Sequence, residues 1–383
     1  MEKQKLDTAS ALELLSNSPE LLSSATLVGE YLDWICSVCE EHKENKHKES
    51  YIKNIQEEEK YTGKRPFLSI VMRTQGKRIS LLREVLLCLY SQSNQDFELI
   101  IVGHKVDLDN RDKIQRVIQE QEPSFRERIR YYEIDYGTRA SPLNFGFSHA
   151  RGLYIVNCDD DDIVLENWVS ALYVKAQSSP NCLLHVYTVT QSWSAHEVGG
   201  SNAARADGYP QPAYCRDYSQ FVQLHHNMCP FFSIAFPSYI FNKLNIWFDE
   251  ELDTVEDWDY IMRTALLAGV ADIPETLLIY RLWRNTESSH TLHNEYLWKK
   301  NEVEIIKKSD SYPVLLKPGY SAEIRAFYTN PVMYSKSFSK REMTSAGEIS
   351  RVEKLKTVFK MHFRESGFIY RFCRRAYQFY KKK

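Results

Sequence analysis

The stretch "GLYIVNCDDDDIVLENW", residues 152–168, passes from an apolar segment directly into four consecutive aspartates. Residues 152–157 are typical of a buried strand, so the carboxylates of Asp159–Asp162 stand just beyond its carboxyl end. A run of like charges is usually a solvated turn, and this interpretation stays open at this point. The other interpretation is that something positively charged meets the run. The position directly after a buried strand favours the second interpretation.

The chain around this stretch alternates short apolar runs with helical patterns. Strands are predicted at residues 67–73, 97–103 and 128–134, in addition to 152–157. Between the first two strands, apolar residues at helical spacing predict a helix over residues 79–90. This alternation predicts an α/β fold with a doubly wound, mostly parallel sheet. Ligands of such sheets bind beyond the carboxyl ends of the strands, which is where the aspartates stand.

A further helix is predicted just before the strand that carries the aspartates. Ser141 and Pro142 have the character of its N-cap and its first helical residue. Leu143, Phe147 and Ala150 follow at helical spacing and are expected to face inward.

Composition divides the 383-residue chain into three regions. Residues 1–63 lack strand-like runs and are interpreted as a helical extension that ends in a charged, solvated linker. Residues 64–310 hold the predicted α/β domain, and residues 311–383 form a C-terminal region with a basic tail. Hydrophobic residues make up 43% of the chain, which is enough for a packed core and excludes wholesale disorder.

The C-terminal tail has a charge opposite to that of the rest of the chain. Residues 354–383 contain ten Lys or Arg and one acid, Glu365, and interleave them with Phe and Tyr. The preferred interpretation is a basic amphipathic helix that lies on an anionic membrane surface. An ordinary solvated helix that packs on the domain is the main alternative. Nucleic acid is not an expected partner, because no DNA- or RNA-binding motif accompanies the charge.

The rest of the sequence predicts a reduced cytoplasmic protein. The N-terminus has no signal-peptide pattern, and no run of 18 apolar residues occurs. The eight cysteines are scattered and do not have the spacing of a disulfide framework. The basic tail would allow a peripheral position on the inner face of the cell membrane.

One group of residues has a spacing that suggests zinc. Cys36, Cys39, His42 and His47 read C-x2-C-x2-H-x4-H. The loop between the two pairs is far too short for a zinc finger, and both cysteines fall within a predicted helix. Packing is therefore the preferred interpretation.

The aspartate run has the composition of a site for a hard cation. Asp159 and Asp161 are spaced to share a divalent ion, or to divide between an ion and a ribose. Mg²⁺ and Mn²⁺ prefer oxygen ligands and are commonly completed by substrate phosphates. We therefore expect Mn²⁺ or Mg²⁺, held jointly by the protein and a diphosphate.

A second acidic cluster lies in "FDEELDTVEDWDYIMRTALLAG", residues 248–269. Apolar residues at helical spacing predict a helix with an apolar stripe made of Phe248, Trp258, Ile261, Met262, Ala265 and Leu266. Glu256 and Asp257 then fall in the first turn, where the helix dipole favours carboxylates. They either cap the helix or supply a general base that is held ionised near the helix end.

Three stretches together resemble a known family. They are "PFLSIVMRTQGKRISLLREVLLCLYSQSNQDFELIIVG", "NFGFSHARGLYIVNCDDDD" and "FDEELDTVEDWDYIMR", in this order. Residues 66–285 resemble the inverting GT-A glycosyltransferases of family 2. The resemblance implies a GT-A fold and a nucleotide-diphosphate sugar as the donor.

The resemblance also implies roles for the residues of the aspartate run and the first loop. Thr74 and its neighbours Arg73 and Gln75 would line the nucleotide pocket. Asp159 to Asp161 would be the DxD element: Asp161 is the direct metal ligand, Asp159 shares the metal or the donor, and Asp160 lies on the donor side.

Other implied roles concern the acceptor and the sugar. Asp257 matches the base that takes the proton from the acceptor hydroxyl, and Glu256 stands beside it. Arg139 and Asn144 would brace the sugar or the phosphate. One base without a second nucleophile implies a single displacement with inversion.

The chain departs from the family pattern at three places. Many members have an acidic pair after the second strand that reads the base, whereas this chain has Gly103 and His104; the imidazole of His104 could hydrogen-bond a base edge. Gly76 stands where an aromatic residue often stacks on the base. At the late position where some members have a histidine near the metal, this chain has Trp283, with His290 seven residues further on.

The expected function is therefore a metal-dependent, inverting glycosyltransferase. It would move a hexosyl or deoxyhexosyl group from a nucleotide-diphosphate donor to a glycan or lipid-linked glycan, in surface polysaccharide synthesis of the O-antigen or capsule type. The alternative is a non-catalytic scaffold that binds sugar nucleotides and reaches the membrane through its basic tail.

Overall fold

The computed structural model describes most of the chain. The described residues are 13–40, 45–198, 201–284, 295–316 and 319–329. The chain divides into two compact units between Val314 and Leu315. In the second unit the described helix is α14 (Tyr320–Thr329). The basic tail from residue 354 onward lies outside the described residues, so its membrane role stays a prediction.

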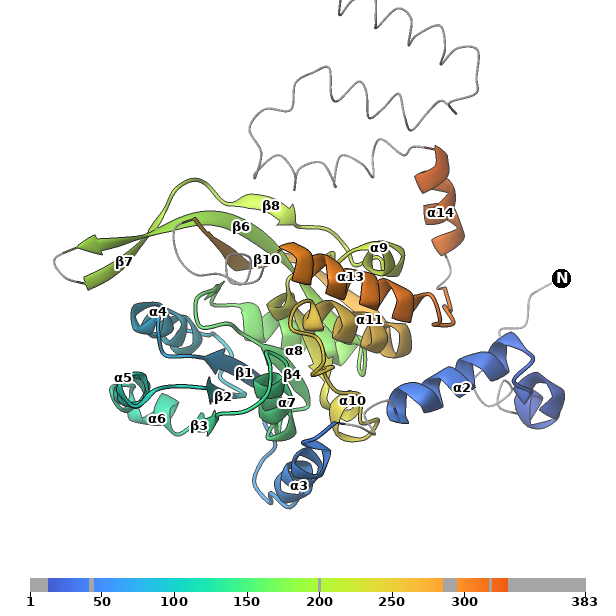
Figure 1. Ribbon diagram of the computed structural model, residues 1–383, viewed down its shortest axis with the longest axis horizontal. Coiled ribbons are helices and arrows are strands. Elements are labelled where there is room, and N and C mark those ends of the chain that lie inside the picture. The colour runs from blue at the N-terminus through green and yellow to red at the C-terminus, as the bar shows by residue number, and fades with distance from the viewer. Residues whose placement is uncertain (1–12, 41–44, 199–200, 285–294, 317–318, 330–383) are drawn as a thin grey trace, which may run out of the picture. The chain divides into compact units, whose positions relative to one another are not determined.

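A ten-stranded sheet runs through the described part of the first unit (Figure 1). Its strand order is β3-β2-β1-β4-β9-β6-β10-β5, and β7 and β8 both pair with β6. The strands are β1 (Leu68–Thr74), β2 (Phe97–His104), β3 (Ile129–Ile134), β4 (Tyr154–Asn157), β5 (Ile163–Val164), β6 (Leu183–Val198), β7 (Ser201–Ala206), β8 (Gln211–Tyr214), β9 (Ile234–Pro237) and β10 (Val270–Trp283).

The sheet confirms the predicted α/β class. Strands β3, β2, β1 and β4 are parallel neighbours, in the order expected for a doubly wound sheet. Strands β6 and β10 are also parallel, whereas β9, β5, β7 and β8 run antiparallel to their neighbours. The antiparallel strands were not part of the prediction.

Helices cover the sheet on both faces (Figure 1). The remaining helices of the first unit are η1 (Pro19–Leu22), α2 (Leu27–Glu40), α3 (Lys48–Glu59), α4 (Ile79–Tyr90), α5 (Leu108–Gln119), α6 (Pro123–Arg126), α7 (Ser141–Ser148), α8 (Trp168–Ser178), α9 (Gln220–His225), η2 (Phe231–Ser233), α10 (Ser238–Asn242), α11 (Glu256–Ala268) and α13 (Glu295–Ser309). Among the described helices, none is long and apolar enough to cross a lipid bilayer.

Side chains of the central strands alternate between two apolar cores. On β1, Val71 packs into the core that contains α7 and α11, whereas Ile70 and Met72 pack into the core that contains α4, α5 and α8. Ile100 and Leu99 of β2 divide in the same way. Because both faces are covered, these strands are apolar along most of their length, which is why they stand out in the sequence.

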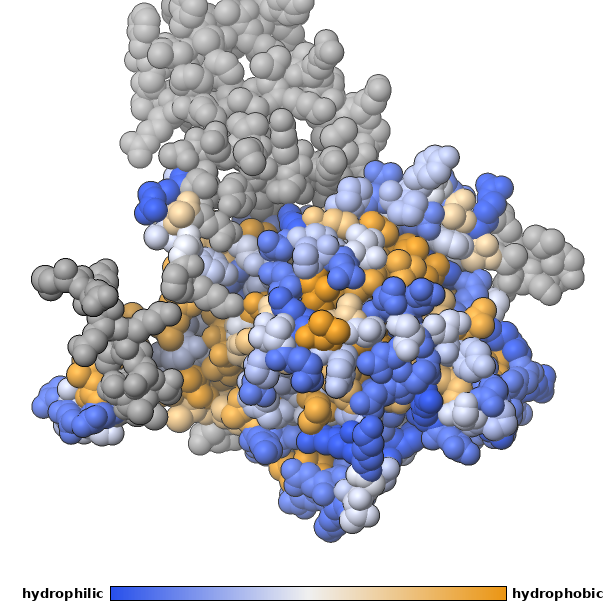
Figure 2. Space-filling model, turned by 180° about the vertical axis from the view of Figure 1, so that it is seen from behind, coloured by the Kyte–Doolittle hydropathy of each residue, from blue (hydrophilic) through white to orange (hydrophobic). Residues whose placement is uncertain are grey.

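The outer surface is mixed in character. Seen from the side opposite to Figure 1, hydrophobic residues are interspersed with hydrophilic ones (Figure 2). Scattered exposed apolar side chains such as Leu87 and Val174 are normal for a globular surface and carry no functional inference.

Two helix boundaries differ from the sequence-based expectation. Helix α7 begins at Ser141, and its N-cap is Ala140; the hydroxyl of Ser141 instead accepts a hydrogen bond from the amide of Thr138 at 3.0 Å. Phe248 precedes α11 and is not part of its stripe, although its ring stacks on Tyr260 of α11 at 3.9 Å between centroids. Local spacing identified both apolar faces but not the residues at which the helices begin.

Helix α3 lies within the charged stretch that was interpreted as a solvated linker. Tyr51 and Ile55, four residues apart on one face, are buried in the core next to α7. The Tyr51 hydroxyl also donates to Glu250 Oε1 at 2.5 Å. The charged residues of this stretch therefore occupy the other faces of a docked helix.

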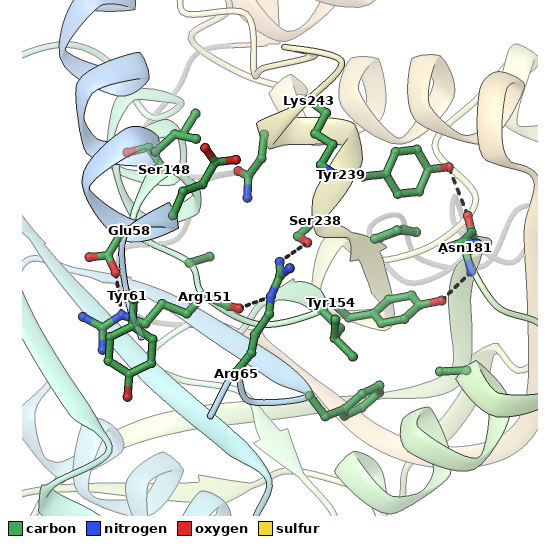
Figure 3. Close-up of a pocket in the computed structure, with 18 of the residues that line it drawn as sticks. Glu58, Tyr61, Arg65, Ser148, Arg151, Tyr154, Asn181, Ser238, Tyr239 and Lys243 are labelled. Atoms are coloured by element: carbon green, nitrogen blue, oxygen red, sulfur yellow. Dashed lines mark hydrogen bonds and ion pairs between the residues drawn. The ribbon is translucent and has the colours of Figure 1, made fainter. Parts of the chain in front are cut away.

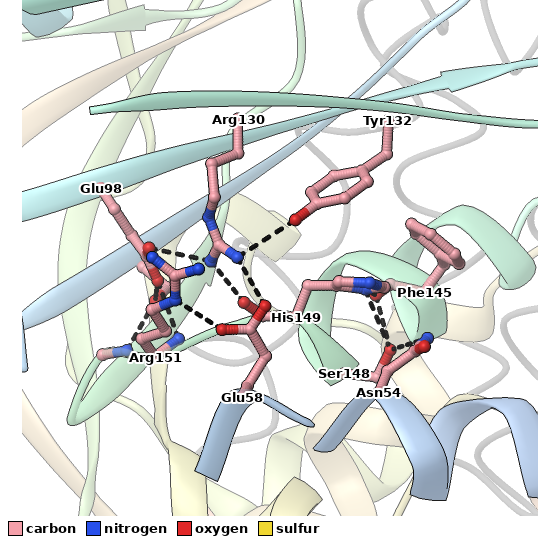
Figure 4. Close-up of polar contacts among 11 residues, drawn as sticks. Asn54, Glu58, Glu98, Arg130, Tyr132, Phe145, Ser148, His149 and Arg151 are labelled. Carbon is pink, nitrogen blue, oxygen red and sulfur yellow. Dashed lines mark hydrogen bonds and ion pairs between the residues drawn. The ribbon is translucent and has the colours of Figure 1, made fainter. Parts of the chain in front are cut away.

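An ion-pair network fixes the end of α3 to the sheet (Figure 4). Glu58 of α3 accepts from Arg130 Nη1 of β3 at 2.8 Å and from Arg151 Nε at 2.5 Å. Arg130 Nη2 also donates to Glu98 Oε2 of β2 at 2.8 Å. The Glu58 side chain is only 15% exposed, so little water competes for it.

We predict that Glu58→Gln lowers the free energy of unfolding by about 1–2 kcal/mol, less than the loss of a fully buried partner because Glu58 retains some solvent contact. The neutral amide would remove the anion that pairs with Arg151 and one of the two anions that pair with Arg130. Urea unfolding measures the change. Glu57→Gln is the matched control, because Glu57 lies on the same helix and its pairing with Lys53 is solvent-exposed; equal losses in both variants would contradict the structural role of Glu58.

Candidate active site

Acidic and basic side chains gather at the carboxyl edge of the parallel strands. Strand β1 ends at Thr74, and β4 ends at Asn157, immediately before the aspartate run. These two strands are hydrogen-bonded neighbours, so the loops that follow them lie together. The first turn of α11, with Glu256 and Asp257, reaches the same edge through contacts described below.

The aspartate run is met by an arginine, which answers the question raised by the sequence. Arg78 Nη2 lies 2.9 Å from Asp160 Oδ1, and Arg78 Nη1 bonds Asp161 Oδ2. Asp160 and Asp162 are buried, and the side chain of Asp161 is 13% exposed. Three of the four carboxylates therefore point inward, and only Asp159 is substantially open to solvent, at 33%.

Each inward carboxylate also has a neutral partner. Thr74 Oγ1 donates to Asp160 Oδ2 at 2.5 Å, which ties the end of β1 to the run. The Trp283 indole donates to Asp161 Oδ2 at 2.8 Å, and the backbone amide of Arg281 donates to Asp162 Oδ1 at 2.9 Å. The end of β10 thus positions two of the aspartates.

Burial and mutual repulsion raise the pKa values within the run. Burial, followed by the charges of Asp160 and Asp159, raises the pKa of Asp161 to about 6, although Arg78 opposes the shift. Burial also raises the pKa of Asp162 well above its usual value. These carboxylates therefore crowd more negative charge into the edge than Arg78 alone neutralises, and a bound cation would favour their ionised forms.

The second acidic cluster begins at a strained residue. Val255, the N-cap of α11, has φ = 57°, which is rare for a β-branched side chain. Strain of this kind persists only where surrounding contacts enforce it, and it is common at functional sites. Here it precedes Glu256 and Asp257 directly.

The two carboxylates of this cluster have different environments. Glu256 Oε1 accepts from Arg73 Nη1 at 2.8 Å and from Arg139 Nε at 3.3 Å. Asp257 Oδ2 accepts from Asn227 Nδ2 at 3.2 Å, and Oδ1 accepts from the Trp258 amide at 2.8 Å. Glu256 is committed to two cations, whereas Asp257 has only neutral donors.

These environments separate the two pKa values. Burial alone would raise the pKa of Glu256, but Arg139 and Arg73 lower it to about 2. Burial, together with the adjacent charge of Glu256, raises the pKa of Asp257 to about 6. A carboxylate poised near neutrality beside one that stays ionised is the arrangement expected where one of the two exchanges protons.

Arg73 joins the two acidic clusters into one site. Its Nη1 contacts Glu256, and its Nε lies 3.5 Å from Asp159 Oδ1. The same Nη1 donates to the carbonyl of Arg139 at 3.0 Å. The aspartate run and the first turn of α11 are therefore separated by a single guanidinium group.

The other predicted donor residues lie in different settings. His104, at the end of β2, contacts the Tyr136 carbonyl through Nε2 at 3.0 Å, and burial lowers its pKa. Gln75 is exposed in the loop after β1. Asn144 is fully buried and is not brought to the carboxylates: its amide bonds the backbone of Phe248 at 2.9 Å in both directions. Asn144 thus supports the segment that leads to α11.

Sequence reasoning missed several residues of this edge. Arg78 had a local signal, because it lies in the loop after β1 and Gly76, at φ = 71°, turns that loop. Asn227 had none, since it comes from the segment between α9 and η2. Arg281, whose guanidinium carbon lies 4.2 Å from the Trp193 ring centre, also had none.

The donor set at the aspartate run fits a hard divalent cation completed by a substrate. No group of three or more His, Cys, Asp or Glu residues that could hold a metal occurs among the described residues. Asp159 and Asp161 nevertheless each direct their described contacts to a single oxygen, leaving the other oxygen available. Two carboxylates with substrate phosphates are a common ligand set for Mg²⁺.

The mostly parallel sheet with a ligand edge at the carboxyl ends of its strands resembles the α/β domain of the GT-A type. Residues 69–237 match the family model described as glycosyl transferase family 2. The matched segment, which is less than half of the chain and contains the aspartate run, is similar to family 2 glycosyltransferases. One curated relative, an uncharacterized glycosyltransferase (MJ1057) of Methanocaldococcus jannaschii, is 24% identical over 261 residues, which cover 61% of this chain and 85% of the relative.

Solved structures of TarS from S. aureus are similar to this chain at low identity. TarS 1–349 in complex with UDP-GlcNAc gives a TM-score of 0.48 at 16% identity, with 69% of this chain and 72% of that chain covered. The complex with UDP gives 0.49 at 14% identity, with 76% and 78% covered. This chain also matches two further TarS structures, of which it covers 60% and 43% of the length. All of these TM-scores are below 0.5, so the likeness is a loose one.

Proposed function

We propose that this protein transfers a sugar from a nucleotide-diphosphate donor to a glycan hydroxyl, with inversion and with Mn²⁺ or Mg²⁺. The observation that carries the proposal is the position of Arg73 between Asp159 and Glu256, the neighbour of Asp257. A diphosphate bound at the aspartate run and an acceptor hydroxyl at Asp257 would then lie on two sides of one small space.

On the donor side, the charges suit a leaving diphosphate. Asp161 and Asp159 would hold the divalent ion, which when bound neutralises charge on the leaving group. Arg78 and Arg73 add guanidinium groups of the kind that bind phosphate oxygens. Thr74 and Trp283 hold Asp160 and Asp161 in place.

Further donor contacts come from the ends of the neighbouring strands. Gln75 and His104 follow β1 and end β2, where a nucleotide would lie. Arg139 reaches the same space through its pairing with Glu256. We propose these three residues as contacts to the nucleotide and the sugar.

On the acceptor side, Asp257 acts as the general base. The acceptor oxygen forms a bond to the anomeric carbon while the bond to the diphosphate oxygen breaks, and the diphosphate leaves with that electron pair. The acceptor proton passes to Asp257, whose orientation is set by Asn227 and the Trp258 amide. Glu256 remains ionised and holds Arg73 and Arg139. One displacement inverts the anomeric centre.

The acceptor and the setting are part of the proposal. We propose a glycan or lipid-linked glycan of a surface polysaccharide as the acceptor and a hexosyl or deoxyhexosyl group as the transferred sugar. The cytoplasm would supply the donor, and residues 354–383 would bring the enzyme to an anionic membrane where an anchored acceptor lies.

A donor panel tests the proposed activity. UDP-, GDP- and TDP-hexoses are incubated with the full chain, Mn²⁺ and a lipid-linked oligosaccharide extract, and the released nucleoside diphosphate is measured. We expect one donor to give release that depends on the acceptor. Tight donor binding without release across the whole panel would contradict the proposal and favour a sugar-nucleotide-binding scaffold.

The activity should rise with pH through about 6, because Asp257 has to be ionised to accept the proton. Below this pKa the enzyme carries a protonated Asp257, so log(kcat/KM) should fall by one unit for each pH unit. Glu256, with its pKa of about 2, stays ionised over this pH range, so its titration adds no second slope to the pH profile.

Asp161 also has a raised pKa, so the assignment needs a control. The pH profile is measured at several saturating Mn²⁺ concentrations, because a metal ion competes with protons for its ligand. If the midpoint of the pH profile is the same at every Mn²⁺ concentration, the fall in activity at low pH is assigned to Asp257. A midpoint that falls as Mn²⁺ rises would assign it to the metal ligand instead.

A further inference from the structure

A cavity whose lining is drawn in Figure 3 lies at the amino ends of the parallel strands, whereas the aspartate run lies at their carboxyl ends. Its volume is about 470 Å³. Its walls come from the residues that precede β1 and β4, from the end of α3, and from α10. These segments mark the amino ends of the parallel strands, so this cavity is separate from the carboxyl edge described above.

Arg65 offers a fixed guanidinium group in the middle of this cavity (Figure 3). Its Nε donates to the Arg151 carbonyl at 2.5 Å, and its Nη2 donates to the Gly152 carbonyl at 2.9 Å and to Ser238 Oγ at 2.7 Å. A guanidinium has five N–H donors, and these contacts use three of them. The two N–H groups of Nη1 have no partner among the described residues.

The cavity also holds a buried acceptor without a donor. The side-chain oxygen Oδ1 of Asn242 is buried and has no hydrogen-bond partner within the described structure. An unpaired buried polar atom is costly, and because Asn242 lines the cavity, a rotation of its side-chain amide would bring this oxygen to a ligand hydroxyl or N–H group. Lys243, the next residue, adds an exposed ammonium group to the same wall.

The charge balance of the cavity is positive. Arg65, Arg151 and Lys243 face two acids, Glu58 and Glu59. Glu58 is already neutralised by its contacts with Arg130 and Arg151. An anion is therefore the ligand that the unused Arg65 donors and Lys243 fit.

Three tyrosines are among the residues that line the cavity. The Tyr154 hydroxyl accepts from the Asn181 amide at 3.1 Å, and the Tyr239 hydroxyl donates to the Asn181 carbonyl at 3.2 Å. Both rings are thereby held in place. Tyr61 lies under the Arg151 guanidinium at 4.2 Å. A pyranose ring presents a C–H face to such rings and hydroxyl groups to its rim.

We propose that this cavity binds a saccharide unit that carries a carboxylate or phosphate group. The anionic group pairs with Arg65 Nη1 and Lys243, a hydroxyl donates to Asn242 Oδ1, and the ring packs against the tyrosines. The proposal goes beyond the proposed transfer reaction and does not depend on it, since the cavity lies at the other edge of the sheet.

Isothermal titration of the full chain tests the proposal with four probes: glucuronate, glucose 6-phosphate, glucose and inorganic phosphate. We expect glucuronate or glucose 6-phosphate to bind at least about tenfold more tightly than either glucose or phosphate, because only they combine charge and hydroxyl groups. The tighter of the two identifies the anionic group. Equal binding of glucose, or of inorganic phosphate, would overturn the proposal.

Variants locate the binding. Lys243→Glu reverses an exposed charge of the cavity and should weaken the preferred probe by about tenfold or more. Asn242→Ala should weaken it as well, without affecting inorganic phosphate. Lys300→Glu, an exposed lysine on α13, is the matched control and should bind normally. Arg78→Gln removes a cation at the other edge and should also bind normally; loss of binding there, with Lys243→Glu unaffected, would place the probe at the other edge and overturn the proposal.

Discussion

Asp257→Asn is expected to bind the donor normally and to lower kcat by about 10²–10⁴-fold, the range that a positioned general base contributes. The amide keeps the shape of the side chain and can still accept from the Trp258 amide, but it cannot take a proton. Released nucleoside diphosphate gives the rate, and calorimetric titration with the donor gives the affinity.

The control for this variant lies four residues earlier. Asp253→Asn makes the same chemical change at an exposed position of the loop before α11, and it should leave both the rate and the affinity unchanged. If Asp257→Asn retains more than about a tenth of the wild-type rate, Asp257 is not the base. If it loses donor affinity in parallel, the substitution has disturbed Arg73 and Glu256 rather than the proton transfer.

Asp161→Asn is expected to lower kcat/KM by about a hundredfold or more, because charge on the leaving diphosphate would no longer be balanced by a tightly held ion. The variant should need more Mn²⁺ for half-maximal activity than the wild type. Treatment of the wild type with EDTA should abolish transfer, and added Mn²⁺ should restore it.

The expected effect of Asp161→Asn has an alternative without a metal ion, because Arg78 already contacts Asp160 and Asp161. If Arg78 alone neutralised the run, the enzyme would stay active in EDTA. Asp161→Asn would then keep the wild-type rate, as is expected of the control Asp253→Asn. Either result would contradict the metal role of Asp161. It would leave the role of Asp257 untouched, because the two variants probe opposite sides of the reaction.

The parallel half of the fold could be predicted because both faces of its strands are buried. Strands β1, β2 and β4 are mostly apolar runs, and each ends in polar residues that mark the carboxyl edge. The antiparallel strand β9 is equally apolar, but its sequence carries no information on direction. Strands β6, β7 and β8 lie between β4 and β9 in the sequence. The place of β9 beside β4 therefore depends on contacts between residues that are distant in sequence.

The carboxylates of the site could also be predicted, whereas most of their partners could not. Asp159–Asp162 and Asp257 stand next to periodic apolar patterns that fix their place. Trp283 and Asn227 act on these carboxylates from segments far away in the chain. Helix α3 is a second example of partners that the sequence does not reveal. Its charged sequence is typical of a linker, but Glu58 pairs with Arg130 and Arg151, which are distant in sequence.

The central claim is that one site joins a diphosphate at the aspartate run to a base at Asp257. The most direct test is a crystal structure of the full chain with Mn²⁺ and the nucleoside diphosphate of the donor that the panel identifies. We predict Mn²⁺ bound to Asp161 and to the diphosphate, with Asp257 facing the space beyond the diphosphate where the sugar would lie. A diphosphate bound elsewhere, with Asp160 and Asp161 still paired only to Arg78, would contradict the account.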